Sequence, residues 1–205
     1  MSMAQLDKLG RVRLSQNFWM REFLYSEVAN LHGIPNIPDD PDLAVEAGSR
    51  LCQELLEPLH RTFGKVLIRS AYRSCAVNGF CNEQQRAGKQ GYGCSSNDRN
   101  FAGHIWDRRD AEGNMGATAC IVLPWFADRF EVSEWRRLAW WIHDHLPYSS
   151  LFFFPRLVAF NIQWRENPER WIQSWIEPKG YLTRPGMPNH GGLHAVEYEG
   201  FPPAA

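Results

Sequence analysis

Three side chains that can hold a metal ion stand within a short stretch of this sequence. His104 and Asp107 belong to the segment 103–107, and Cys120 follows in the apolar run 117–123. Imidazole, thiolate and carboxylate all suit zinc, and three protein ligands leave a fourth position for a water of near-neutral pKa. We therefore take His104, Asp107 and Cys120 as the candidate metal ligands and zinc as the candidate cofactor.

A β-hairpin is the element expected to position these side chains. Segments 103–107 and 117–123 have strand composition, and the turn residues of 110–114 separate them. Cross-strand neighbours in a hairpin lie within contact distance, so the three side chains can meet. Two other interpretations stay open: His104 as a buried histidine bonded to a carboxylate, and Cys120 as a core thiol.

The remaining elements indicate an α+β domain with a small antiparallel sheet and helices packed on it. Apolar residues recur at helical spacing over 43–62 and 134–145. Pro58 should kink the first of these helices, and Gly64 is typical of a helix end. The Gly-, Gln- and Asn-rich segment 78–99 predicts a long loop that carries function. The segments 66–69, 151–154, 158–164 and 171–176 predict short strands. We expect the sheet to contain 66–69, 117–123 and the pair within 158–176.

The composition of the chain limits the classes of protein to which it can belong. The chain has 205 residues, 44% of them hydrophobic, and a net charge of −1. These values fit one domain. The segment 177–205 shows no clear period and is expected to be an irregular tail, and the family resemblance described below implies a core over about 14–176. The absence of a basic field argues against nucleic acid and anionic membranes as partners. Nine Trp indicate a Trp-rich core or aromatic recognition surfaces, and Trp140 and Trp141 fit either.

The first ten residues lack the apolar core of a signal peptide. The longest apolar run, 151–160, is interrupted by Pro155 and Arg156 and is too short to cross a bilayer. We therefore expect a protein made in the cytoplasm without a signal peptide and without a membrane span.

The other histidines and cysteines leave alternatives open. His143 and His145 are favoured near a helix C-terminus by the helix dipole, while His190 and His194 belong to a flexible tail or complete a site. The five cysteines are reduced thiols in a cytoplasmic protein, or they include a disulfide such as Cys81–Cys94, or they bind metal.

Four pieces of the chain, in order, resemble a known family. They are 14–18 with Glu22 and Phe23, then 51–59 with the strand and turn 66–74 and Asn78, then 97–124, and last 170–175. The strand followed by Ser70-Ala-Tyr-Arg-Ser74 is the most specific. Together they resemble the zinc D-alanyl-D-alanine carboxypeptidase superfamily, whose fold the Hedgehog signalling domain shares.

The resemblance implies a single zinc, held by a His and an Asp of one motif and by a later His on a strand. It also implies an arginine, matched here by Arg73 or Arg69, that pairs with the free carboxylate of a cell-wall peptide. Arg73 alternatively pins the 78–99 loop. The implied partner is peptidoglycan or another cell-surface glycan, with self-association or virion proteins as further partners.

The sequence departs from that motif. If 100–107 is aligned to it, Asp107 is kept but Asn100 replaces the first His. If His104 is the first ligand, Cys120 replaces the Asp. In both alignments Ile172 stands where the last His is expected. We therefore expect a carboxypeptidase-like domain with a degenerate zinc site that acts by binding or assembly, for example as a component of a phage-like or gene-transfer particle. The alternative is an active zinc peptidase that cleaves peptides containing D-alanine.

Overall fold

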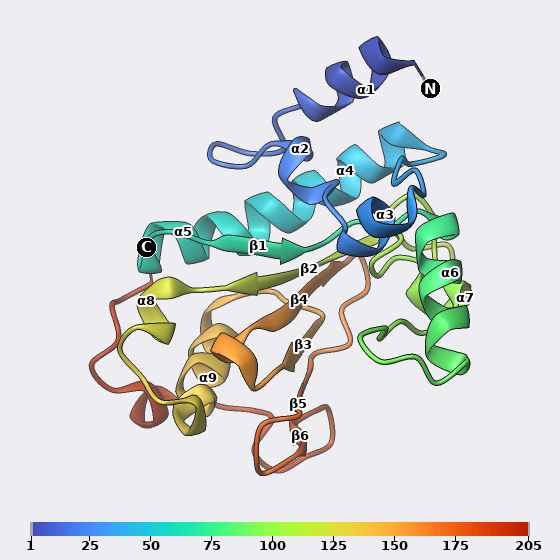
Figure 1. Ribbon diagram of the computed structural model, residues 1–205. Helices are drawn as coiled ribbons and strands as arrows, with labels where there is room; N and C mark the ends of the chain where they lie inside the picture. The colour runs from blue at the N-terminus through green and yellow to red at the C-terminus, as the bar shows by residue number, and fades with distance from the viewer. Residues whose placement is uncertain (1, 205) are drawn as a thin grey trace.

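One mixed sheet organises the computed structural model, which describes residues 2–204 (Figure 1). Within these residues six strands pair in the order β1-β2-β4-β3-β5-β6. All neighbouring pairs are antiparallel except β3 and β5, which run parallel. The strands are β1 (Leu67–Ser70), β2 (Gly116–Val122), β3 (Ser150–Phe153), β4 (Phe160–Arg165), β5 (Trp171–Ser174) and β6 (Gly180–Thr183).

The sheet confirms the α+β class and corrects the expected strand pairing. The strands predicted within 158–176 correspond to β4 and β5, but they are not neighbours, because β3 lies between them. β3 pairs with β4 antiparallel and with β5 parallel. Local composition predicts which segments form strands. The order of the strands depends on pairing between segments that are distant in the sequence.

A long helical segment packs on one face of the sheet, as the sequence predicts. α4 (Pro41–Leu51), the π-helical turn η1 (Cys52–Leu56) and α5 (Glu57–Phe63) follow one another without a break. Pro58 lies in the first turn of α5, where its missing N–H is tolerated because the π-helical turn precedes it. Gly64 ends the helix with φ +78°, a value that suits glycine.

The second predicted helix is α9 (Trp135–His145), and it packs on the same face of the sheet. Phe63 of α5 lies 4.6 Å from Trp141 of α9 between ring centroids, and Trp135 lies 5.0 Å from Phe153 of β3. Trp140 and Trp141 are buried, so they belong to the core and not to a sugar platform. No helix within residues 2–204 combines the length and apolarity needed to cross a bilayer.

Shorter helices surround this core. Ser2 caps α1, and Ser26 caps α3. The remaining elements are α1 (Met3–Gly10), α2 (Met20–Phe23), α3 (Glu27–His32), α6 (Cys75–Arg86), α7 (Asn97–Asn100), α8 (Pro124–Ala127), η2 (Val132–Glu134), η3 (Arg156–Val158) and η4 (Ala195–Tyr198).

The expected loop over 78–99 is wrong for its first half, which is helical. Ser74 caps α6 by accepting a hydrogen bond from the backbone N–H of Val77. The polar composition of this segment resembles a loop because α6 buries only Val77, Asn78 and Cys81. A disulfide joins Cys81 to Cys94, which confirms the alternative named for this pair and excludes reduced thiols there; Cys52, Cys75 and Cys120 are free.

The hairpin expected at 103–107 and 117–123 is also wrong. Segment 117–123 is strand β2, but 103–107 consists of turns, with a single β-bridge between Phe101 and Ile105. This segment crosses closely over the start of β2: a Cβ on Gly116 would lie 2.3 Å from the carbonyl oxygen of Ala102. Strand β2 instead pairs with β1 and β4.

The C-terminal segment is irregular over much of its length but contains one strand and one short helix. It forms β6 at the edge of the sheet, then runs past α9 through η4 to the neighbourhood of α5 (Figure 1). Phe201 lies 6.0 Å from Phe63 between ring centroids, and Tyr198 lies 5.6 Å from His145. Tyr198 and Phe201 therefore pack this segment on the domain core.

Candidate functional site

Four of the side chains singled out in the sequence lie near the end of β1 and the chain that follows it: Arg69, Arg73, His104 and Cys120. Residues Ala71 to Ser74 connect β1 to α6, and Asn36 holds them in place. Its amide donates to the carbonyl of Tyr72 at 3.0 Å, and its Oδ1 accepts from the backbone N–H of Ser74 at 2.7 Å. The backbone N–H of Arg73 donates to the carbonyl of His104 at 2.8 Å. Arg73 is thus fixed between two segments that are distant in sequence.

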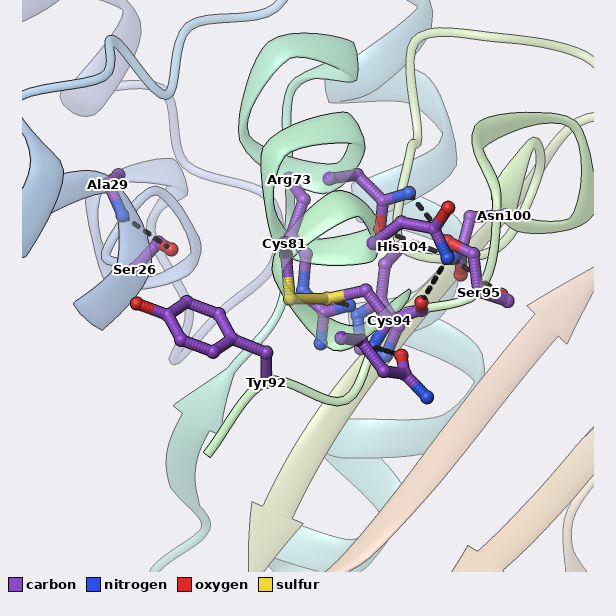
Figure 2. The surroundings of a disulfide bond; sticks show 12 residues. Ser26, Ala29, Arg73, Cys81, Tyr92, Cys94, Ser95, Asn100 and His104 are labelled. Atoms are coloured by element: carbon purple, nitrogen blue, oxygen red, sulfur yellow. Dashed lines mark hydrogen bonds between the residues drawn. A yellow bond between two sulfur atoms is a disulfide. The ribbon is translucent and has the colours of Figure 1, made fainter. Parts of the chain in front are cut away.

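The disulfide lies against this arginine (Figure 2). Nη1 of Arg73 lies 3.1 Å from Sγ of Cys94, and Cys94 is bonded to Cys81 on α6. Buried amides hold the neighbouring turn: Asn78 donates to the carbonyl of Ser95 at 3.0 Å, and Asn100 donates to Oγ of Ser95 at 2.8 Å. The segment that carries Cys94 is therefore held by a covalent bond and by a hydrogen-bond network.

His104 is buried beside Arg73. Its Nδ1 lies 2.7 Å from the carbonyl oxygen of Ala71, so this nitrogen carries the proton and Nε2 carries the lone pair. Burial, and next the positive charge of Arg73, lower the pKa of His104 to about 3. His104 is therefore neutral at physiological pH.

Cys120, on β2, lies near Arg69 and Arg73. Burial raises the pKa of this thiol, and the charges of Arg69 and Arg73 oppose that effect. Arg69 lies in the irregularity of the β1–β2 pairing, next to the Ser70–Cys120 pair. We call Arg69, Arg73, His104 and Cys120 the arginine site.

Charge in the arginine site is not balanced by a carboxylate contact. Within residues 2–204, neither Arg69 nor Arg73 lies within 4.0 Å of a carboxylate oxygen. Burial lowers the pKa of Arg73, and the smaller effects of Cys120 and of the charge of Glu27 act in the opposite direction. A partly desolvated guanidinium without a carboxylate contact is suited to accept an anionic ligand.

A row of side chains extends from this site across the sheet face that is turned away from α4, α5 and α9. Cross-strand pairing places Cys120 beside Asn161, Asn161 beside Phe152, and Phe152 beside Gln173. Asn161, Phe152 and Gln173 are half buried. Side chains of directly paired residues lie on one face of a sheet, so this row forms a polar and aromatic strip.

An aromatic cluster flanks the row. The ring of Trp175 lies 5.2 Å from that of Phe152 and 5.4 Å from that of Phe154, between centroids. Trp175 is 58% exposed. An exposed tryptophan beside amide side chains can stack on the apolar face of a sugar or on a peptide side chain.

Asp107 lies outside the arginine site. Its Oδ2 accepts a hydrogen bond from the backbone N–H of Asp39 at 2.7 Å, and its charge contributes to raising the pKa of Tyr72 and of Cys75. Arg108 adds an ion pair with Asp39 at 2.7 Å. Asp107 therefore anchors the turn that precedes α4, where a groove of about 1030 Å³ is lined by Asp39 and Cys75, among others.

The three predicted metal ligands do not form a zinc site in this arrangement. Within residues 2–204, His104, Asp107 and Cys120 are not among the groups whose ligand atoms all lie within 4.8 Å of one another. Ile172, the position expected for the third imidazole, is buried in the core on the helix-covered face of the sheet. The Cys120 thiol is protonated at neutral pH because its pKa is raised. These residues do not fit zinc at this place.

A different group of potential ligands does come together at the end of α9. His143, Asp144 and His194 are the one group in residues 2–204 with three His, Cys, Asp or Glu ligand atoms within 4.8 Å of one another. We call these three residues the histidine cluster. In the sequence, the helix dipole alone accounts for His143, and nothing near it indicates that it meets His194. The signal that points to it is the pair of tail histidines followed by Tyr198 and Phe201, since aromatic residues in a tail indicate packing on a core.

Comparisons with protein-family models, with curated protein sequences and with solved structures give no match to this chain.

Proposed function

We propose that this chain is a D,D-carboxypeptidase-like cell-wall domain with a degenerate zinc site, which binds the free carboxylate of peptidoglycan peptides without cleaving them. The observation that carries the proposal is the Arg73 guanidinium, held in place and partly desolvated without a carboxylate within 4.0 Å in residues 2–204. The carboxypeptidase-like fold and the cell-wall ligand rest on the sequence resemblance, and the anion preference rests on Arg73.

A carboxylate fits this place for a chemical reason. The guanidinium offers several N–H donors in a plane, and a carboxylate accepts two of them in a bidentate pair. Arg69, on the same edge of the sheet, supplies a second positive charge. His104 is neutral, so the positive field of the site comes from the two arginines.

The row of side chains on the sheet face supports a ligand longer than one residue. Asn161 and Gln173 present amides that can donate to and accept from peptide groups. The exposed ring of Trp175 provides a stacking surface beyond them. A muropeptide has both parts: a peptide that ends in a carboxylate and a sugar with apolar faces.

Cleavage is not expected, because the arginine site has no group prepared to activate water. Hydrolysis by this route needs a metal-bound water or a base placed against the scissile carbonyl. His104 has a pKa of about 3 and is a weak base, and Cys120 is a protonated thiol. We therefore expect binding without turnover.

A binding experiment with matched ligands tests the proposal. Isothermal titration measures the affinity of a peptide ending in D-Ala-D-Ala and of the same peptide with a carboxamide end. The carboxylate form should bind at least about 10-fold more tightly, because a charge-assisted hydrogen bond contributes about 1.5–3 kcal/mol. Equal affinities of the two peptides would contradict the carboxylate site.

Variants locate the ligand. Arg73→Gln should remove the difference between the two peptides, whereas Arg99→Gln should keep it, since Arg99 is exposed on α7. Circular dichroism verifies that both variants fold. Release of D-alanine from muropeptides in the presence of zinc would overturn the binding-only proposal and support an active zinc peptidase.

A further inference from the structure

The structure assigns a second site, independent of the proposed function, to the junction of α9 and the C-terminal segment. We propose that His143, Asp144 and His194 bind a divalent transition metal of the zinc type, which fastens the C-terminal segment to the helix. The three ligand atoms lie within 4.8 Å of one another. His194 lies 50 residues from Asp144 in the sequence, so only the folded chain brings it to the end of α9.

Asp144 is the centre of the group. Its side chain is 1% exposed, and its Oδ1 lies 2.8 Å from Nδ1 of His194. Oδ2 accepts from the backbone N–H of His194 at 2.6 Å and from the hydroxyl of Tyr198 at 2.9 Å. No Lys or Arg of residues 2–204 forms an ion pair with it. A buried carboxylate next to imidazoles, with no such ion pair, is a donor set that zinc accepts.

Each imidazole is held on its outer side in the way that metal-binding histidines require. Nδ1 of His143 lies 2.6 Å from the hydroxyl of Tyr148, and Nε2 of His194 lies 3.0 Å from the carbonyl oxygen of Asn189. A ligating histidine donates its second N–H to such an acceptor, which fixes the ring and its tautomer. The nitrogens for the metal are then Nε2 of His143 and Nδ1 of His194, and on binding each gives up its present hydrogen bond, to the carbonyl oxygen of His190 and to Oδ1 of Asp144 respectively.

Packing fixes the ring planes. His194 stacks on Trp140, with 3.9 Å between ring centroids and 10° between planes. His143 packs edge-on against Trp140 at 5.4 Å and against His194 at 5.4 Å. Rings fixed in this way lose little further freedom when they bind an ion, which favours affinity.

Metal binding would replace one hydrogen bond of His143. In the metal-free protein Nε2 of His143 lies 2.9 Å from the carbonyl oxygen of His190, which can only accept, so this nitrogen carries the proton. When Nε2 binds the metal, the proton moves to Nδ1, which then donates to the hydroxyl of Tyr148.

A third histidine lies beside the cluster but is not part of it. The ring of His190 lies 5.1 Å from that of His143, and its Nδ1 lies 3.2 Å from Oγ1 of Thr183. Arg170 donates to the carbonyl oxygen of His143 at 2.8 Å and adds positive charge nearby, which the carboxylate of Asp144 offsets. The two imidazoles and the carboxylate of the cluster make three protein ligands, and a water can take the fourth position of a tetrahedral zinc site.

Zinc itself is the probe for the test. The purified protein is incubated with zinc at pH 7.5 and desalted, and its metal content is measured by inductively coupled plasma mass spectrometry. About one equivalent should remain, and the melting temperature should fall when a chelator is added. His194→Ala should lower the zinc affinity about 100-fold or more, and Tyr148→Phe about 10-fold, since it removes only the outer hydrogen bond.

His145→Ala is the matched control. It lies on the same helix but packs on Trp141, with 4.6 Å between ring centroids, and is not part of the cluster. This variant should keep the zinc content of the wild type, and the thermal melting of each variant in chelator verifies that it folds.

Two results would overturn the proposal. If the wild-type protein retains no zinc, the cluster holds the C-terminal segment on α9 by hydrogen bonds alone. Zinc kept by His194→Ala but lost by Cys120→Ala would move the metal to the arginine site, which would also contradict the proposed binding-only function. Loss of zinc in His194→Ala with an unchanged preference for carboxylate peptides would confirm this site alone.

Discussion

The arginine site and the histidine cluster differ in what holds their side chains. Arg73 and His104 are held from their backbones, by the Arg73–His104 hydrogen bond and by the Asn36 contacts. The histidine cluster is held by side chains that meet each other, through the Asp144 contacts to His194 and Tyr198. The first is part of the domain framework, whereas the second joins two segments that could separate.

This difference has a chemical counterpart. The arginine site concentrates positive charge without a carboxylate contact and suits an anion. The histidine cluster concentrates imidazoles around a buried carboxylate and suits a cation. Sequence motifs pointed to a metal at the first place, and the geometry favours a metal at the second.

The largest effect is expected where the framework of the arginine site is broken. Asn78 is fully buried, donates to the carbonyl of Ser95 and to Oδ1 of Asn97, and accepts from Asn100. Asn78→Ala should lower the free energy of unfolding by about 4 kcal/mol, because buried partners lose their hydrogen bonds. Urea denaturation measures this, with the exposed Asn30→Ala as control. A loss below about 1 kcal/mol would show that the framework does not depend on this network.

The next prediction concerns the pH dependence of stability, which differs between the arginine site and the histidine cluster. His104 has a pKa of about 3 in the folded protein and an ordinary value of 6.5 when unfolded. Between these values the unfolded chain binds the extra proton, so stability falls as the pH falls, by about 1.4 kcal/mol per pH unit. From pH 6.5 to 4 this amounts to about 3 kcal/mol.

His104→Gln should remove that part of the slope, as measured by urea denaturation at several pH values. The lowered pKa of His143 acts in the same direction and should remain as a smaller slope in the variant. An unchanged slope in His104→Gln would assign the acid sensitivity to the histidine cluster instead.

Removal of the disulfide should have a somewhat smaller effect. Cys81 and Cys94 are 13 residues apart, and closing a loop of this size stabilises a protein by about 2–3 kcal/mol. Replacing both by Ala should lower the free energy of unfolding by that amount and reduce the preference for carboxylate peptides, because Cys94 contacts Arg73. Cys75→Ala, a free thiol on the same helix, is the control. An unchanged peptide preference would show that the disulfide does not position the arginine.

The smallest effect on global stability is expected in the histidine cluster. Asp144→Asn keeps the size of the side chain but removes the charge that His194 and Tyr198 contact, which should cost about 1–2 kcal/mol. The consequence is local, so limited proteolysis should cut the segment after β6 sooner in the variant, while the melting of the sheet changes little. Equal cleavage rates would show that aromatic packing alone holds this segment.

Local pattern in the sequence determined much of the framework. The helical periodicity over 43–62 and 134–145 corresponds to α4 to α5 and to α9, and Gly64 ends the first of them. Strand composition located β1, β2 and β3, as well as β4 and β5. These features depend on side-chain spacing and backbone propensity, which act between near neighbours in the chain. The α+β class follows from them.

Tertiary structure alone decided the strand order, the contact of Asp107 with Asp39 and the contact of His194 with Asp144. β3 lies between β4 and β5 because of long-range pairing, which residue composition does not encode. Asp107 shares a segment with His104, but the turns of 103–107 direct it to Asp39 and not to Cys120. His194 reaches Asp144 across 50 residues, since Tyr198 and Phe201 pack the tail on the core. Contacts between distant segments depend on the shape of the whole core, and so no motif or period in the chain displays them.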